Sequence, residues 1–381
     1  MYQISDSVEY SPNTISTDLF GTNFVLSYDM EFLDSGPLLE LLGSLEPDNL
    51  RYPGGSLTEI MFSQVEYGEE NWAEQYFSSI QNGTSQRENM ISFVQSTAEI
   101  GADIQLVVPT KIAFLQTAGQ AIASGNYGAR RELDPRYFDL LDDYITEFLS
   151  VSAENGVEVS RIEIGNEFWG SGEMTAQEYG FLAASVTEYI SDKFPDLNVI
   201  SQVSYIAGYF SPVEDSEVYL VENGSDFDIY FPWEDLEGIS GLEEHILPGQ
   251  GSGVGQTQDI AMQFLDNSTA LSSLDGIVDH IYFRKGFEGI DNERDHGLIS
   301  IPQTFEDITG LDDLDTYITE WSVRNISGDH DSEGTNHTGL QYASSTLEAF
   351  FELVQHGVTG ANFWPTTFGN ESIDRRVLID T

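Results

Sequence analysis

The feature that most constrains this chain is an alternation of short apolar runs with longer stretches of helical periodicity. Strands that alternate with helices pair in parallel, and right-handed crossovers leave few arrangements for them. Eight such runs favour closure into a (β/α)8 barrel, the TIM barrel. The eight predicted strands are Leu19–Tyr28, Asn49–Gly54, Ile104–Pro109, Arg161–Asn166, Asn198–Val203, Gly276–Phe283, Thr316–Glu320 and Gly360–Trp364.

Capping signals indicate where several of the helices begin. Ser85 with Glu88, and Thr175 with Glu178, have the spacing of a capping box. The helices that follow them are expected to end near Ile100 and Phe194, and Asp134-Pro135 opens a long helix because proline is favoured at the first helical position. Further helical patterns cover Gly36–Leu45, Thr257–Leu274, Thr304–Ile308 and Gly339–Gln355.

An open, doubly wound sheet is the structural alternative to a barrel. It would predict a glycine-rich phosphate turn after the first strand, and Leu19–Met30 contains none. Another glycine-rich run, Gly249–Gly255, does not follow a strand and is expected to be a flexible loop. It belongs to Ser204–Gln256, a long stretch predicted to be irregular and to shape a cleft at the end of the fifth strand.

The domain organisation expected from these runs is a single barrel over residues 1–381, with its strands inside about 18–366. Only 17 residues (381 − 364) follow Trp364, which is too few for a loop and a good eighth helix. The last helix is therefore expected to be lacking or truncated, and a further C-terminal domain beyond residue 381 is compatible with this.

Charge and composition exclude several functional classes. The chain carries 14 Lys+Arg against 65 Asp+Glu, a formal charge of −51, so a basic nucleic-acid footprint is absent. No apolar run approaches the roughly 18 residues that a membrane helix needs. A content of 40% hydrophobic residues supports a large core despite the charge. The absence of cysteine removes disulfides, thiolate metal sites and a cysteine nucleophile.

The carboxylates are spread along the whole chain, as in an acidic secreted or halotolerant protein whose self-repulsion is relieved by salt. The segment Met1–Tyr10 has neither a basic nor an apolar region of a signal peptide. We therefore expect an extracellular protein secreted by a route independent of a signal peptide, with a cytoplasmic location as the alternative. The oligomeric state stays open.

Two glutamates stand out because each directly follows an apolar strand. Glu167 follows the fourth strand in Ile-Glu-Ile-Gly-Asn-Glu-Phe-Trp-Gly, and Glu320 closes the seventh in Tyr-Ile-Thr-Glu-Trp. Catalytic groups of TIM barrels lie at the carboxyl ends of strands. Burying a carboxylate there costs several kcal/mol unless it is paired or used. The two together predict a catalytic pair across the barrel mouth.

These residues carry a resemblance to glycoside hydrolases of clan A. The segments Ile164–Gly170 and Met174–Tyr179 resemble the acid/base region of that clan, most closely of family 51, the α-L-arabinofuranosidases. Arg51–Gly55, with the sequence Arg-Tyr-Pro-Gly-Gly, resembles the strand-two motif of the same family. His280-Ile281-Tyr282 and Trp364 also match the clan pattern. Residues around Glu320 and in Phe20–Phe24 depart from family 51 and suit families 30, 39 or 79 equally.

The resemblance implies a retaining enzyme in which Glu167 is the general acid/base and Glu320 the nucleophile. Asn166 would bind the 2-hydroxyl of the sugar. Arg51 and Tyr282 would keep Glu320 ionised, while Glu167 stays protonated beside a second carboxylate. Retaining glycoside hydrolysis needs no cofactor, and the expected partner is a carbohydrate substrate.

Aromatic residues and a histidine are further candidates for contacts with substrate. Trp364 would form an apolar platform under the sugar, and His280 would contact it. For each, a place in the core is the alternative. Trp169, Trp321 and Trp233 are either outer sugar platforms or plain packing residues.

Basic residues are scarce, yet several follow predicted strands. Arg51, Lys111, Arg284, Lys285 and Arg324 account for 5 of the 14 and all fall at the presumed barrel mouth. A positive funnel there would recruit an anionic substrate such as a uronic-acid or sulfated glycan. The alternative is that these cations pair with local acids.

Metal binding is weakly indicated. Asp291, Glu293 and Asp295, before Gly297, have part of the spacing of a calcium loop but lack the later bidentate glutamate. We therefore expect no resident metal. Two other functional classes remain open: a non-catalytic glycan-binding barrel, and a segment of a calcium-dependent surface protein.

Overall fold

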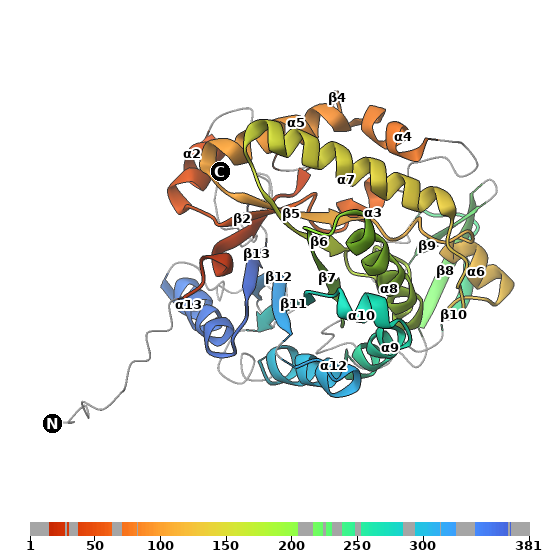
Figure 1. The fold of residues 1–381 in the computed structure, drawn as a ribbon. Helices are drawn as coiled ribbons and strands as arrows, with labels where there is room; N and C mark the ends of the chain where they lie inside the picture. Colours follow the sequence, from red (N-terminus) through yellow and green to blue (C-terminus); the bar gives the residue numbers. More distant parts are fainter. Residues whose placement is uncertain are drawn as a thin grey trace.

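The protein is a closed TIM barrel of eight parallel strands (Figure 1). The computed structural model describes residues 15–26, 29, 37–62, 71–81, 83–204, 216–223, 226–230, 238–247, 253–284, 294–312, 314–324, 340–364 and 366. Around the barrel the strands follow the order β1-β13-β12-β11-β7-β6-β5-β2. Their bounds are β1 Gly21–Asn23, β2 Asn49–Tyr52, β5 Asp103–Val108, β6 Val159–Ile164, β7 Asn198–Gln202, β11 Gly276–Arg284, β12 Asp315–Arg324 and β13 Gly360–Phe363.

Helices cover the outside of the barrel. The α-helices are α2 Pro37–Leu45, α3 Leu57–Phe62, α4 Trp72–Ser78, α5 Gln86–Ile100, α6 Ala118–Ser124, α7 Pro135–Asn155, α8 Ala176–Lys193, α9 Gly253–Asp266, α10 Ser268–Ser272, α12 Ile301–Thr309 and α13 Leu340–Gln355. A 3-10 turn, η1 Thr17–Phe20, precedes β1, and a π-helical segment, η2 Arg294–Ser300, precedes α12. A short hairpin joins β3 Ile80–Gln81 to β4 Thr84–Ser85.

The predicted helix starts are confirmed in the structure. Ser85 and Glu88 form the capping box of α5, and Thr175 and Glu178 form that of α8. The side chain of Asp134 caps α7, with Pro135 in its first turn. These caps satisfy backbone amides that the helices themselves leave without partners.

The two faces of the barrel strands have different chemistry. Side chains that alternate outward, such as Leu106 and Ile164, join the main core with Tyr144 and Phe148 of α7. Inside the barrel, a small apolar cluster of Ile200, Val278 and Tyr317 lies toward the amino ends of the strands. Beyond it toward the carboxyl ends, the interior is polar and holds the candidate site.

The first strand is shorter than predicted. Only Gly21–Asn23 of Leu19–Tyr28 is in β1. The amide of Val25 donates to the side chain of Asp29 at 2.6 Å, and the amide of Asp29 donates to the carbonyl of Val25 at 2.9 Å. These two bonds close a helical turn, which ends the strand.

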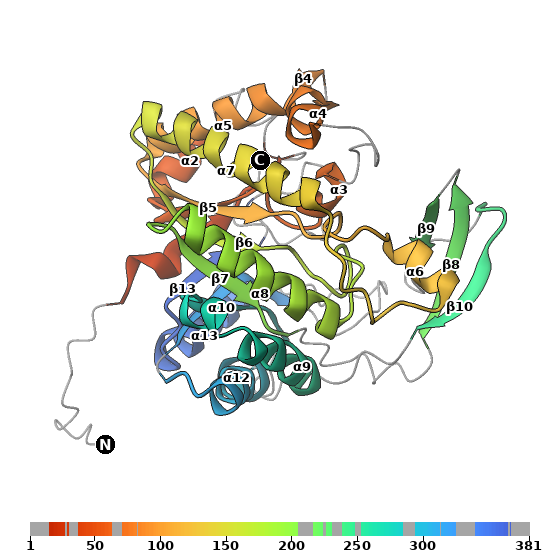
Figure 2. The ribbon, with the colours of Figure 1, turned by 45° about the vertical axis from the view of Figure 1, so that its right-hand side comes forward.

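The prediction that Ser204–Gln256 is irregular is wrong for its described parts. Most of them form an antiparallel sheet in the order β10-β8-β9, with β8 Ser216–Asn223, β9 Asp226–Tyr230 and β10 Glu243–Leu247. The expected loop Gly249–Gly255 is wrong for its described part, because Gly253–Gly255 begin α9. In the sequence, the dipeptide Gly224-Ser225 separates β8 from β9 and is a two-residue hairpin signal. The sheet lies beside α6 (Figure 2), where Leu220 packs against Ala118, Ala121, Ile122 and Tyr127.

Other element boundaries differ from the prediction as well. The expected helix Thr257–Leu274 is two helices, α9 and α10, because the side chain of Asn267 accepts from the amide of Ala270 and begins a new helix. The predicted Thr304–Ile308 extends to the whole of α12, and η2 precedes it. The expected truncation of the last helix lies outside the described residues. None of the described helices is long and apolar enough to cross a membrane.

Carboxylates crowd the amino end of the barrel, where strands begin. Asp103 at the start of β5 lies near Glu158, Asp48 and Asp18. Burial raises the pKa of Asp103, its acidic neighbours raise it further, and Arg161 opposes them. Because its pKa is higher in the folded state than in the unfolded one, protonation favours folding, and stability falls as pH rises through the folded pKa.

Asp103→Asn is therefore expected to stabilise the protein at pH 7. Asp103 is partly exposed, so solvent screening limits the gain to about 0.5 kcal/mol. Thermal unfolding of wild type and variant at pH 7 and at pH 3 measures it. The gain should vanish at pH 3, where the wild-type carboxyl is protonated in both states, and should shrink in strong salt. An equal gain at both pH values would contradict the electrostatic explanation.

Candidate active site

A β-bulge aims Glu320 into the barrel. Along β11 and β12, Asp279 pairs with Ile318, and the next residue, His280, pairs with Glu320. Thr319 is therefore an extra residue of β12 that has no paired residue on β11. Neighbouring side chains of a regular strand point to opposite faces. Here Thr319 Oγ1 donates to Glu163 at 3.1 Å and Glu320 accepts from Arg51 at 2.8 Å, so both point inward. Glu320 therefore lies within β12 rather than at its predicted end.

Glu167 lies just beyond β6, on a turn with an unusual backbone. β6 ends at Ile164, two residues earlier than predicted. Gly165 has φ 72° and Glu167 has φ 47°, both in the left-handed region. That region is unfavourable for a glutamate and is typical of functional sites. The Glu167 side chain is 27% exposed, against 3% for Glu320, so it is the more accessible of the two.

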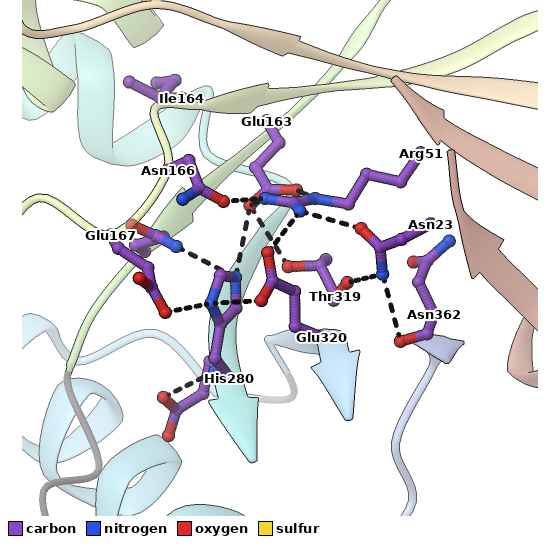
Figure 3. A network of polar contacts seen from close by, with 12 residues as sticks. Asn23, Arg51, Glu163, Ile164, Asn166, Glu167, His280, Thr319, Glu320 and Asn362 are labelled. Atoms are coloured by element: carbon purple, nitrogen blue, oxygen red, sulfur yellow. Dashed lines mark hydrogen bonds and ion pairs between the residues drawn. The ribbon is translucent and has the colours of Figure 1, made fainter. Parts of the chain in front are cut away.

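His280 lies between the two glutamates (Figure 3). Its Nδ1 is 3.4 Å from Glu167 Oε1 and 3.6 Å from Glu320 Oε2. One oxygen of each glutamate and one ring nitrogen lie within 4.8 Å of one another. The His280 side chain is only 2% exposed. The predicted catalytic pair is thus brought together, with a histidine at its centre.

The surroundings of His280 favour its charged form. Burial alone would lower the pKa of the imidazole, but the charge of Glu320 and hydrogen bonds to Glu163 and Glu167 outweigh it and raise the pKa to about 10. The cation therefore contributes stability that is complete below pH 6.5 and is lost as pH rises through about 10.

Gln202 lies where it can accept a hydrogen bond from this cation. Its terminal amide is 3.2 Å from His280 Nε2, and its Oε1 has no hydrogen-bond partner among the described residues. A half turn of the amide brings Oε1 to face Nε2–H. That orientation satisfies both groups and matches an imidazole protonated on both nitrogens.

Arg51 is the polar centre of the site. It is fully buried, and each of its five N–H groups has an acceptor. The acceptors are Glu163 Oε2 at 2.7 Å, Glu163 Oε1 at 2.8 Å, Glu320 Oε1 at 2.8 Å, Asn23 Oδ1 at 2.9 Å and Asn166 Oδ1 at 2.9 Å. Burial alone would lower the pKa of Arg51, but the charges of Glu163 and Glu320 outweigh this effect and raise the pKa above its ordinary value.

Glu163 is a site residue that the sequence analysis missed. It lies inside the barrel on β6 with no exposed surface, and it also accepts from Gln105 at 2.6 Å. Burial raises the pKa of its carboxyl, but Arg51 and His280 overcome this and lower it to about 2. A charged residue in the middle of an apolar strand was the available signal, because such a group is buried only when it is paired.

Two of the other predicted residues, Tyr282 and Asn166, also join this cluster. Tyr282 donates its hydroxyl to Glu320 Oε2 at 2.5 Å. The side-chain oxygen of Asn166 accepts from Arg51, and its side-chain nitrogen Nδ2 lies 3.5 Å from Ser171 Oγ. Trp364 follows β13 and is partly exposed. Its ring packs on Gly55, where an added Cβ would lie 2.5 Å from it, so the loop after β2 supports the indole by having no side chain.

The remaining tryptophans lie in the core or outside the description. Trp169 is 8% exposed and packs edge-on against Phe168, 6.2 Å from the His280 ring. Trp321 is 4% exposed and packs against Phe363, so the structure places it as a packing residue. Trp233 lies outside the described residues.

The described basic residues at the mouth are paired with acids. Arg51 is neutralised by Glu163 and Glu320, and Lys111 Nζ lies 2.5 Å from Glu173. Arg284 and Arg324 end β11 and β12, but their side chains lie outside the described part of the structure, as does Lys285.

The calcium candidates Asp291 and Glu293 also lie outside the described residues. Asp295 is paired with Arg294.

Glu167, His280 and Glu320 offer three potential metal-ligand atoms within reach of one another. A ligating histidine must be neutral, because the lone pair of its nitrogen forms the bond. The raised pKa of His280 places a proton there at neutral pH. The trio is therefore better matched to holding a proton than to holding a metal ion.

The comparisons with known proteins extend the fold assignment. No protein-family model matches the chain, and no curated protein matches its sequence. Similar solved structures include a family 51 α-L-arabinofuranosidase from Bifidobacterium longum (TM-score 0.51, 14% identity, 92% of this chain and 67% of that one). The thermostable GH51 α-L-arabinofuranosidase from Thermotoga petrophila RKU-1 gives a TM-score of 0.52, with 14% identity and coverage of 92% and 65%.

A Paenibacillus polymyxa xyloglucanase from glycoside hydrolase family 44 is also similar, with a TM-score of 0.51, 13% identity and coverage of 93% of this chain and 74% of that one. At such identities the likeness establishes a shared TIM barrel. The chain spans about two thirds of the length of the arabinofuranosidases that it matches.

Glu163→Gln is expected to lower the free energy of unfolding by about 3 kcal/mol, because it leaves part of the buried Arg51 charge uncompensated. It should also lower the pKa of His280 below the wild-type value of about 10. Chemical denaturation measures the first effect, and an NMR titration of the ring measures the second. Glu154→Gln, on the exposed side of α7, is the control. An unchanged His280 titration would refute the coupling.

Proposed function

We propose that this protein is a retaining O-glycoside hydrolase. The observation that carries the proposal is the approach of Glu167 and Glu320, whose nearest oxygens lie within 4.8 Å across the barrel mouth. Retaining enzymes hold their two carboxyl groups about 5–5.5 Å apart, whereas inverting enzymes leave about 6.5–9.5 Å for a water molecule. The spacing here matches direct attack by one carboxylate.

The roles follow from accessibility and hydrogen bonding. Glu320 is the nucleophile, because Arg51 and Tyr282 each donate a hydrogen bond to one of its oxygens and fix the carboxyl group inside the barrel. Glu167 is the general acid/base, because it is the more exposed and can reach a leaving group and then a water. Glu320 attacks the anomeric carbon as Glu167 protonates the departing oxygen, and Glu167 then activates the water that releases the sugar.

His280 supports both steps by staying charged. When Glu320 becomes an ester it loses its negative charge, and Glu167 gains one by giving up its proton. The Nδ1 of His280 lies close to both carboxyls, at 3.4 Å and 3.6 Å, so the cation faces a carboxylate before and after the first step. Such a fixed charge stabilises the intermediate without reorganisation of the site.

The substrate class is proposed from the site and from the resemblance to clan A. Asn166 would bind the 2-hydroxyl, Trp364 would pack under the ring, and Trp169 would line the site from the core. An α-L-arabinofuranoside is the first candidate, since family 51 is the closest resemblance in the motifs. A uronic-acid or sulfated glycan is the second, because Arg284 and Arg324 end two strands at the mouth.

Hydrolysis of a panel of nitrophenyl glycosides and polysaccharides, neutral and anionic, tests this function. Glu320→Gln should reduce turnover to background, and Glu167→Ala should reduce it about 10²–10⁴-fold, as expected for the loss of a general acid. The exposed control Glu154→Gln should retain full activity. Glycan binding without turnover in the wild type would instead identify a non-catalytic binding barrel.

The anionic-substrate proposal has its own test. A double charge reversal, Arg284→Glu with Arg324→Glu, should lower kcat/KM on an anionic glycan about tenfold or more at low salt, because the local field would repel the substrate. Hydrolysis of a neutral aryl glycoside is the control and should change little. Unchanged activity on the anionic glycan would rule out this substrate class.

A further inference from the structure

We propose that Glu59, a buried glutamate outside the catalytic pair, is a positioning residue for Glu167. The inference rests on the proposed function, in which Glu167 is the general acid/base. Glu59 lies on α3, the helix that follows the loop after β2, and it has no exposed surface. Neither the sequence motifs nor the reaction chemistry accounts for a carboxylate at this place.

Glu59 joins the ends of two neighbouring strands. Its Oε2 accepts from the amides of Thr110 at 2.8 Å and Lys111 at 2.7 Å, just beyond β5. Its Oε1 accepts from Thr110 Oγ1 at 2.8 Å and from the amide of Asn166 at 3.2 Å, just beyond β6. One carboxylate thus fixes the amide that immediately precedes Glu167.

The segment that Glu59 holds has a backbone conformation that needs support. Gly165 and Glu167 both have positive φ, and Asn166 lies between them. A Cβ at Gly165 would come within 2.7 Å of the Thr110 side chain, so the turn packs tightly against the residue that also binds Glu59. Strained conformations persist only where their surroundings over-determine them.

The pairing of groups around Glu59 fits an ionised carboxylate. Backbone amides only donate, and an ionised carboxyl only accepts. Burial raises the pKa of Glu59, and the bonds from Lys111, Thr110 and Asn166 oppose this. No Lys or Arg side chain among the described residues pairs with it. A buried charge held by three backbone amides and one hydroxyl, without a cation, is costly, which favours a functional reason for its presence.

Misplacing the general acid has a distinctive kinetic consequence. A leaving group such as phenol needs a proton from Glu167 to depart, whereas 2,4-dinitrophenol leaves readily as an anion. A variant that disturbs only Glu167 therefore loses kcat/KM on the phenyl glycoside and keeps it on the dinitrophenyl glycoside. General loss of structure lowers both alike, because the nucleophilic attack is common to them.

The experiment measures kcat/KM of Glu59→Gln on phenyl and 2,4-dinitrophenyl α-L-arabinofuranoside, or on the same pair for the sugar that the glycoside panel identifies. The side-chain amide of glutamine would place an N–H group against groups that now donate hydrogen bonds to Glu59. The turn at Asn166 should therefore shift. We expect a loss of about 10²-fold on the phenyl glycoside, as for a misplacement of about 1 Å, and a loss of less than threefold on the dinitrophenyl glycoside.

Two further variants keep the test independent of folding. Thr110→Val removes one bond to Glu59 and leaves its charge, so it should show a smaller loss with the same dependence on leaving group. Glu178→Gln is the matched control: Glu178 is equally buried and accepts from the amides of Gly128 and Arg130, but it does not contact the Gly165–Glu167 turn. It should leave the ratio of the two rates unchanged.

The outcomes separate this inference from the proposed function. Equal losses on both substrates in Glu59→Gln and Thr110→Val, or an unchanged ratio, would overturn the positioning role while leaving the enzyme assignment intact. A wild-type protein that hydrolyses no glycoside of the panel would refute the proposed function and, with it, the role of Glu59. A selective loss on the phenyl glycoside in both variants, absent in Glu178→Gln, would establish it.

Discussion

The structure of the site depends on one buried guanidinium. Arg51 uses every N–H it has, and its acceptors come from β1, β6, the turn after β6 and β12. A buried cation of this kind is tolerable only when paired and fully hydrogen-bonded. Glu163 supplies a bidentate partner, which leaves Arg51 free to hold Glu320 as well. The planar fork of arginine thus sets where the nucleophile lies and links it to the opposite side of the barrel.

The charges inside the barrel balance, although the chain as a whole is strongly acidic. Arg51 and the His280 cation face Glu163 and Glu320, which gives two positive and two negative groups in a confined space. This balance explains why some of the few basic residues lie in the interior, where burying an unpaired carboxylate would cost free energy. It also separates two supporting roles: Glu163 acts through Arg51 on the nucleophile, and Glu59 acts through the backbone on the acid/base.

Much of this arrangement could be predicted from the sequence, and the misses have physical reasons. The eight strands, the helix caps and the pair Glu167 and Glu320 depend on local patterns, and the structure contains them. Glu163 and Glu59 were missed because their partners are distant in the chain: Arg51 is 112 residues from Glu163, and the partners of Glu59 are 51 to 107 residues from it. In a chain with 65 carboxylates, residue type alone does not distinguish such groups from exposed ones.

The sequence by itself determined the alternation of strands and helices, where the helices begin, and which carboxylates follow strands, because these depend on periodicity and on contacts within a few residues. Only the tertiary structure decided which side chains meet inside the barrel. The bulge at Thr319 and the left-handed turn at Glu167 arise from pairing and packing between distant strands. The protonated state of His280 likewise depends on carboxylates brought in from β6 and β12, because a charge is stabilised by what surrounds it in space and not by its neighbours in the chain.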